Sequence, residues 1–292
     1  MADYHVATTG SNSNPGTQAS PWLTIAYALE HGGGPSNRIW IHAGTYAEVL
    51  NSQLAPIVGG ASWATRLIVS RWSDDVVVVA PAAGERVVML ADADASFIEF
   101  IGLELDGSNI TIDVVKVTYG TTTGVSREIQ FTECEIHSGP GQGVLVSTAH
   151  HVRFVGCSIH ANGTVDTDHG LYISSHSNLV DRCDVYDNAG WGVHIYNGAA
   201  AVADSNIVRD SLCHDNAAAG NRGAGILLSS GFGNVAENNV CWGNQKGIQV
   251  DYLSQDAVLR DNVIYGNDVA QIEIGGGAIN TEQDDNRLPV AA

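Results

Sequence analysis

The sequence has few positive charges, no long apolar run and an odd number of cysteines. Its 292 residues include 13 lysines and arginines against 32 aspartates and glutamates, a formal charge of −19 at pH 7. This charge repels phosphate backbones and anionic lipids, so we expect neither nucleic acid nor a membrane as partner. There is no run of 18 apolar residues, and the opening MADYHVATTG lacks the features of a signal peptide, which predicts a soluble chain. The acidity is typical of a solvated surface adapted to salt or heat, or of cation binding.

Helix-length amphipathic windows and paired cysteines are also scarce. Only 15% of the residues are charged, whereas 33 are glycine and many others are Val, Ile, Asn and Asp, a composition that favours strands and turns. No CxxC pair occurs, so a thiolate metal site is not predicted. The five cysteines instead fall in two columns of a repeat, one with Cys134, Cys157 and Cys183 and one with Cys213 and Cys241, and are predicted to be buried free thiols.

The repeat aligns six segments of the second half of the chain. Its anchor positions are spaced by 23, 26, 28, 28 and 23 residues: Cys134, Cys157, Cys183, Ser211, Asn239 and Asn262. A minimum period with variable loop insertions is typical of stacked coils, in which loops project outward without disturbing the stack. Each coil is then expected to pair in parallel with the next at about 4.8 Å.

Two inward columns of this repeat are apolar and predict a continuous core. They are Val144/Leu171/Val193/Ile226/Ile248/Ile272 and Val146/Ile173/Ile195/Leu228/Val250/Ile274. At the turn before them an asparagine recurs, which predicts a hydrogen-bonded ladder whose asparagines tolerate left-handed φ: Asn162, Asn188, Asn216, Asn244 and Asn267.

The opening of the chain is similar to that of known solenoids. A strand, a polar loop and a helix from Pro21 are predicted, and residues 38–46 form the next strand and turn. The segments VATTGSNSNPGT, SPWLTIAYAL and IWIHAGTY resemble the opening of right-handed parallel β-helix proteins of the pectate-lyase-like superfamily. The resemblance implies an all-β, single-domain right-handed parallel β-helix of about ten coils. Residues 1–37 would form a strand, loop and capping helix, residues 38–277 the coils, and residues 278–292 a tail or cap.

The outward positions of one strand column carry polar and aromatic side chains that a core does not need. Tyr172, His194 and Tyr196 fall on adjacent coils, with Gln249 and Asp251 two coils farther on. Two long turn insertions flank this face, one with Asp166, Asp168 and His169 and one with Asn221 and Arg222, and Trp191 and Lys246 lie on the same edge. Aromatic faces, amides, carboxylates and a few cations suit binding of an acidic polysaccharide along the solenoid; a merely solvated face is the alternative.

The runs HGLYIS, CDVYDNAGWGVHIY and ENNVCWGNQKGIQVDY resemble the β-helix region of polysaccharide lyases and mannuronan C5-epimerases. The resemblance implies β-elimination or C5-epimerisation of a uronate, which needs a base, an acid and a group that neutralises the carboxylate. His194 or His169 is then the candidate base, and Tyr172 or Tyr196 the candidate acid. Arg222 or Lys246 is the candidate neutraliser, and Trp191, Gln249 and Asp251 are further substrate contacts. Asp166 and Asp168, with Asp251, are alternatively candidate Ca²⁺ ligands. The Asp-Thr-Asp-His stretch departs from the epimerases' Asp-Pro-His motif.

A second outward column is aromatic throughout: His137/His160/Tyr186/His214/Trp242/Tyr265. Stacked rings stabilise parallel strands without any ligand, and no carboxylate is expected beside these histidines at a fixed outward place, so no zinc site is predicted. A non-catalytic glycan-binding or tailspike-like adhesion module and a bare scaffold stay open as alternatives to an enzyme. A lyase predicts a monomer and a tailspike a trimer, with an extracellular or virion-associated location.

Overall fold

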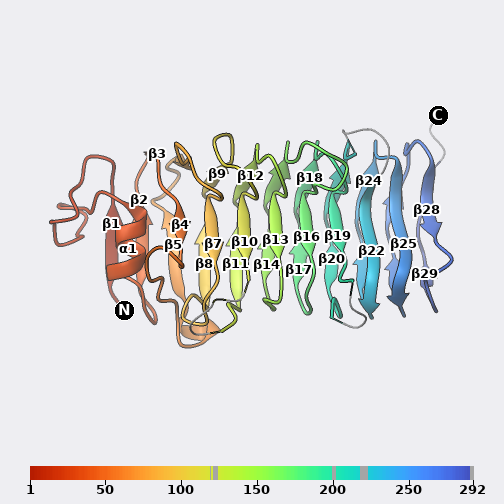
Figure 1. The fold of residues 1–292 in the computed structure, drawn as a ribbon, viewed down its shortest axis with the longest axis horizontal. Helices are drawn as coiled ribbons and strands as arrows, with labels where there is room; N and C mark the ends of the chain where they lie inside the picture. Colours follow the sequence, from red (N-terminus) through yellow and green to blue (C-terminus); the bar gives the residue numbers. More distant parts are fainter. Residues whose placement is uncertain (119, 121–123, 199–201, 218–222, 290–292) are drawn as a thin grey trace.

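The computed structural model describes residues 1–118, 120, 124–198, 202–217 and 223–289. Within these residues the strands form three parallel sheets of eleven, nine and nine members that run along one elongated solenoid (Figure 1). Each strand pairs with the equivalent strand of the neighbouring coil, as the repeat predicts. No helix in these ranges is long and apolar enough to cross a membrane.

The first sheet contains β1 (Asp3–Val6), β2 (Arg38–Ile41), β5 (Leu67–Arg71), β8 (Ile98–Ile101), β11 (Ile129–Thr132), β14 (Arg153–Val155), β17 (Leu179–Asp181), β20 (Ile207–Arg209), β23 (Val235–Glu237), β26 (Val258–Arg260) and β29 (Glu282–Asp284). The second contains β4 (Leu50–Asn51), β7 (Val88–Leu90), β10 (Val115–Val117), β13 (Val144–Val146), β16 (Leu171–Ile173), β19 (Val193–Ile195), β22 (Ala224–Phe232), β25 (Lys246–Gln255) and β28 (Ala270–Ile274). The third contains β3 (Gly44–Tyr46), β6 (Val77–Val79), β9 (Glu104–Asp106), β12 (Glu135–His137), β15 (Ser158–His160), β18 (Asp184–Tyr186), β21 (Leu212–His214), β24 (Val240–Trp242) and β27 (Val263–Ile264).

Helical structure within the described ranges is limited to α1 (Ile25–His31) and one turn of 3-10 helix, η1 (Trp63–Thr65). Helix α1 lies at the N-terminal end of the solenoid (Figure 1) and buries Ile25 and Leu29. It begins four residues later than Pro21 predicts, because Thr24 is the N-cap and accepts a hydrogen bond from the backbone N–H of Tyr27. The preceding chain is held extended, since the Trp22 backbone N–H donates to the His5 carbonyl. That α1 caps the solenoid stays a prediction.

The core is the pair of apolar columns that the sequence predicts. The register of the second sheet joins every member of both columns, and all are buried except Ile272 and Ile274 in the last strand, β28. A stack of Phe100, Phe131 and Phe154 on β8, β11 and β14 extends the core, with ring centroids 5.1 and 5.3 Å apart. The five cysteines are buried and free, as predicted.

The asparagine ladder is present, with one correction. The Asn188 side-chain oxygen accepts from the Asn162 backbone N–H, and the same contact joins Asn188 to Asn216, at 3.2 and 3.3 Å. The left-handed φ predicted for these asparagines falls on the residue before each of them instead, such as Asp187 at 51°. The asparagine itself keeps a conformation in which its amide reaches the next coil. The ladder fixes the turn from which the strands of the second sheet begin.

The coils extend beyond the predicted boundary at residue 277. Strand β29 pairs with β26, and the Asn286 side chain accepts from the Asn262 backbone N–H at 3.1 Å. The polar composition of this segment hides the repeat because its strand residues are exposed, and backbone pairing needs no apolar side chain.

Candidate functional site

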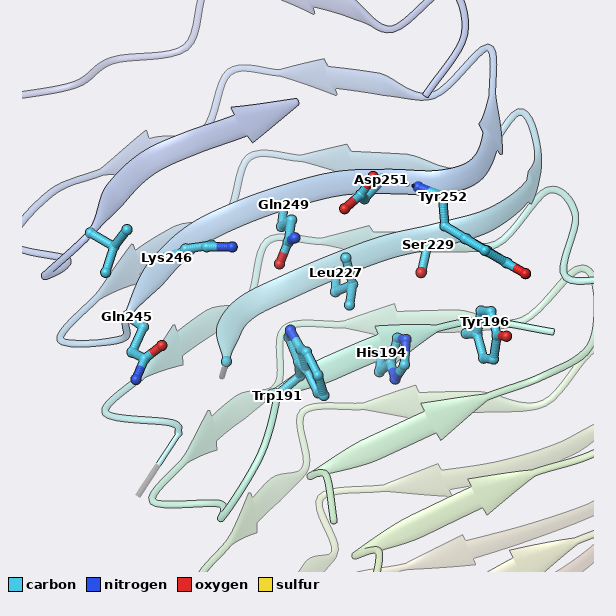
Figure 2. Close-up of a pocket in the computed structure, with 12 residues that line it drawn as sticks. Trp191, His194, Tyr196, Leu227, Ser229, Gln245, Lys246, Gln249, Asp251 and Tyr252 are labelled. Carbon is cyan, nitrogen blue, oxygen red and sulfur yellow. Dashed lines mark hydrogen bonds between the residues drawn. The ribbon is translucent and has the colours of Figure 1, made fainter. Parts of the chain in front are cut away.

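A groove of about 530 Å³ lies over β19, β22 and β25 on the outer face of the second sheet. Figure 2 shows Trp191, His194 and Tyr196 in one row, Leu227 and Ser229 in the next, and Lys246, Gln249, Asp251 and Tyr252 in the third. Three consecutive coils thus contribute one row each. Gly223, Gln245 and Val269 complete the lining.

An irregularity in the strands shapes this groove. Strands β22 and β25 have nine and ten residues, whereas β16 and β19 have three, and their register shifts between Leu228 and Ser230. In β25 two residues, Asp251 and Tyr252, lie opposite the single Ser229 of β22. Tyr252 has a φ of 61° and is exposed, and its ring lies 5.7 Å from the ring of Tyr196. Strict alternation cannot predict a bulge, so the sequence analysis missed Tyr252 as a groove residue.

The four candidate catalytic residues form one cluster. The ring centroids of Tyr172 and Tyr196 lie 5.2 and 5.5 Å from that of His194, and the His169 ring lies 4.7 Å from it. Only His194 and Tyr196 line the groove. Tyr172 stacks on His194 from the neighbouring strand β16, and His169 contacts the His194 ring edge-on. Burial, with Tyr196 as a smaller cause, raises the pKa of Tyr172.

The two histidines of the cluster contact each other directly. His194 Nδ1 lies 3.0 Å from His169 Nε2, and the His169 Nδ1 accepts the backbone N–H of Trp191 at 3.3 Å. His169 is only 4% exposed and His194 9% exposed. Burial lowers the pKa of His169 to about 3, and burial together with His169 lowers the pKa of His194 well below its usual value. Both rings are therefore neutral at pH 7.

The two charged side chains that line the groove, Lys246 and Asp251, each make a hydrogen bond within the protein. Lys246 Nζ lies 2.6 Å from Glu273 Oε1, and the Gln249 amide donates to the same carboxylate oxygen at 3.2 Å. One Asp251 oxygen accepts the backbone N–H of Tyr252 at 2.6 Å. Lys246 is thus a weaker candidate for neutralising a ligand carboxylate than its sequence position suggests. Arg222, the other candidate, lies outside the described residues, as does Asn221.

The two candidate calcium ligands lie on the loop between β15 and β16. One Asp168 carboxylate oxygen accepts the backbone N–H groups of Thr164 and Val165 at 2.9 and 3.0 Å, so it closes the loop on itself. Within the described residues no group of three or more His, Cys, Asp or Glu side chains is placed to hold a metal ion. Neither aspartate lines the groove.

The second aromatic column stacks along the third sheet as predicted. Its rings lie between 4.1 and 6.1 Å apart with nearly parallel planes. The expectation that no carboxylate accompanies its histidines is wrong. Each His Nε2 is 3.0 to 3.3 Å from an acidic side chain of the preceding coil: His137 from Glu104, His160 from Glu135 and His214 from Asp184. The acidic column lies two residues before the aromatic one, and the paired strands of a parallel sheet bring the two into contact.

Comparison with known proteins agrees with this architecture. The family model "Right handed beta helix region" matches residues 95–220 and 167–288. No curated protein matches the chain. Among solved structures, the mannuronan C-5 epimerase A-module of Azotobacter vinelandii is 14% identical, with a TM-score of 0.64 over 96% of this chain and 76% of that one.

Two further solved structures share the fold. A pectate lyase is 12% identical, with a TM-score of 0.63 over 95% of this chain and 78% of its own. A rhamnogalacturonan lyase is 13% identical, with a TM-score of 0.69 over 91% of this chain and 74% of its own. The family match and the three parallel sheets together show that this chain belongs to the right-handed β-helix family, and it shares its fold with the pectate lyase.

Proposed function

We propose that this protein binds a segment of acidic polysaccharide in the groove over β19, β22 and β25. The observation that carries the proposal is the lining itself: Trp191, Tyr196 and Tyr252 offer aromatic faces, and Ser229, Gln249 and Asp251 offer hydroxyl, amide and carboxylate groups. Sugar rings present apolar faces and a rim of hydroxyls, so both kinds of side chain have a partner. The rows lie on successive coils, about 4.8 Å apart, which suits a chain of sugars lying along the solenoid axis.

The proposed reaction is β-elimination or C5-epimerisation of a uronate. In both, a base removes the C5 proton. In elimination the freed electron pair forms the C4–C5 double bond, the C4–O bond breaks and the leaving oxygen takes a proton; in epimerisation a proton returns to C5 from the opposite face. Tyr196 is the proposed proton-transfer group because it lines the groove beside His194. Support for this class comes from the fold shared with an epimerase and two polysaccharide lyases.

The test is incubation with alginates, pectates and glycosaminoglycans. Ultraviolet absorbance detects the unsaturated product of elimination, and proton NMR detects epimerised uronates. We expect activity on at least one polymer, and a loss of about a hundredfold or more in Tyr196→Phe because a positioned proton donor or acceptor is removed. Tyr186→Phe, on the second aromatic column, is the matched control and should keep the full rate. If neither method detects a product with any polymer of the panel, the proposal that the protein is an enzyme is wrong.

A non-catalytic glycan-binding or adhesion module is the second candidate. It is favoured by the 2.6 Å pairing of Lys246 with Glu273, which leaves this cation already neutralised. Binding without turnover on the same panel would support it. Light scattering separates the two further, because a tailspike-like fibre predicts a trimer and a lyase predicts a monomer. In either case we propose an extracellular or virion-associated location, where polysaccharides are met.

A further inference from the structure

The hydrogen bonds behind the groove determine which nitrogen of each histidine carries a proton. The backbone N–H of Trp191 can only donate, so His169 Nδ1, 3.3 Å away, must be the unprotonated nitrogen. A neutral His169 therefore has its proton on Nε2, which donates to His194 Nδ1 at 3.0 Å. A neutral His194 must then carry its proton on Nε2. The donor and acceptor in each of these hydrogen bonds therefore follow from one backbone amide, that of Trp191.

This series of hydrogen bonds ends at His194 Nε2–H, a donor with no acceptor among the described residues. Among the residues that the structure describes, none accepts a hydrogen bond from His194 Nε2 or from the indole Nε1 of the neighbouring Trp191, and both atoms are buried. The two rings lie 5.0 Å apart, and both side chains line the groove. A buried polar group without a partner costs about 1–3 kcal/mol, so two side by side at a groove are unusual unless a ligand satisfies them.

We propose that His169 holds His194 in its Nε2–H tautomer, so that His194 Nε2–H and Trp191 Nε1–H together bind an acceptor-only group of the ligand, a sugar carboxylate. The inference rests on the proposed function and specifies it. A carboxylate accepts at two oxygens and offers no proton, which matches two donors, and hydrogen bonds to a charged acceptor are about twice as strong as neutral ones. Both atoms are buried, so binding at them requires a shift of side chains at the groove floor.

This assignment changes the role of both histidines in the proposed reaction. His194 presents a proton at Nε2, so it is a hydrogen-bond donor to the carboxylate and not the base that removes the C5 proton. His169 does not line the groove and acts through His194, as a positioning residue. The donor pair also explains how a carboxylate is held where Lys246 is occupied by Glu273.

The first test needs no glycan. In protein with ¹⁵N-labelled histidine, long-range proton–nitrogen NMR at pH 7 distinguishes the two neutral tautomers. We expect the Nε2–H form for both His169 and His194. In His169→Phe, which removes the donor to Nδ1, the His194 signal should move toward a mixture of tautomers, whereas His169→Gln, which keeps one donor and one acceptor, should restore the Nε2–H form. An Nδ1–H or doubly protonated His194 in the wild type overturns the inference.

The second test uses oligogalacturonates and oligomannuronates, each beside the same oligomer with its carboxyls reduced to hydroxymethyl groups. We expect the wild type to prefer the carboxylate form, and Trp191→Phe and His194→Phe each to lower that preference about tenfold. Trp242→Phe and His160→Phe, on the other aromatic column, should leave it unchanged. If the intact and reduced oligomers bind equally, the inference is wrong while the glycan groove stands. If none binds, the proposed function fails too, and the NMR result still decides the tautomer.

Discussion

Two outward columns of this solenoid carry histidines and aromatic rings on neighbouring coils, and they differ in one respect. On the third sheet every histidine of the column is paired with a carboxylate of the preceding coil, at 3.0 to 3.3 Å. At the second sheet, His194 Nε2 and Trp191 Nε1 are buried beside a groove, and no partner for them lies in the described part of the chain. Composition alone does not separate the two columns. Histidines paired with carboxylates have their hydrogen-bonding groups satisfied within the protein, whereas buried donors without a partner support our proposal that the column of the second sheet contacts a ligand.

Acidification should lower the free energy of unfolding through the two buried histidines at the groove, His169 and His194. The pKa of His169 is lowered to about 3 and that of His194 is also lowered, so between pH 6.5 and about 3 the unfolded chain binds protons that the folded chain cannot. Stability from these residues is present above pH 6.5 and is lost as the pH falls, by at most about 1.4 kcal/mol per pH unit for each histidine. Urea unfolding at a series of pH values measures it. His169→Phe should flatten the dependence; an unchanged slope in this variant would contradict the burial argument.

Trp191 lines the groove and Trp242 lies in the aromatic column of the third sheet, so substituting each to alanine tests which of the two places binds the glycan. Trp191→Ala removes an aromatic face and an N–H from the groove, and we expect affinity for the bound oligosaccharide to fall by about 2 kcal/mol, roughly thirtyfold. Trp242→Ala removes the same side chain from the paired column and should leave affinity unchanged. Isothermal titration calorimetry measures both. A similar loss in the two variants would mean that the groove is not where the glycan binds.

Substitutions in the aromatic column of the third sheet should lower the free energy of unfolding and leave glycan binding unchanged. Tyr186 stacks between His160 and His214 at 4.7 and 5.2 Å, and Tyr186→Leu should lower the free energy of unfolding by about 0.5–1 kcal/mol. Tyr196→Leu is the counterpart in the groove and should weaken glycan binding instead. Denaturant midpoints and titrations on both variants test the division. Loss of binding in Tyr186→Leu would show that the third sheet also contacts the ligand.

The smallest effect concerns the cation of the groove. Glu273→Gln releases Lys246 from its ion pair, which should raise affinity for an anionic oligosaccharide up to about fivefold, since partly exposed pairs contribute about 0.2–1 kcal/mol. The gain should vanish at high salt. Asp184→Asn makes the same charge change on the paired column, beside His214, and is the control. An equal gain in both variants would indicate a long-range charge effect and no local one.

The spacing of the repeat in the sequence predicts much of this architecture. The register of the anchor column predicts which residues pair, because identical places in successive coils stack directly in a parallel sheet. The inward apolar columns, the buried cysteines and the asparagine ladder all follow from it. The outward positions of Tyr172, His194 and Tyr196 follow as well, and two of these residues, His194 and Tyr196, line the groove.

What the tertiary structure alone decided is which of these polar groups are satisfied. The pairing of Lys246 with Glu273, the contact between His169 and His194, and the bulge that brings Tyr252 beside Tyr196 depend on side-chain directions and on one inserted residue. A column alignment contains neither, because it records where a residue lies along the coil and not which atom its side chain reaches. Spacing therefore determined the solenoid and the outward positions of its aromatic columns. Only the packed structure showed that two buried donors have no acceptor among the described residues.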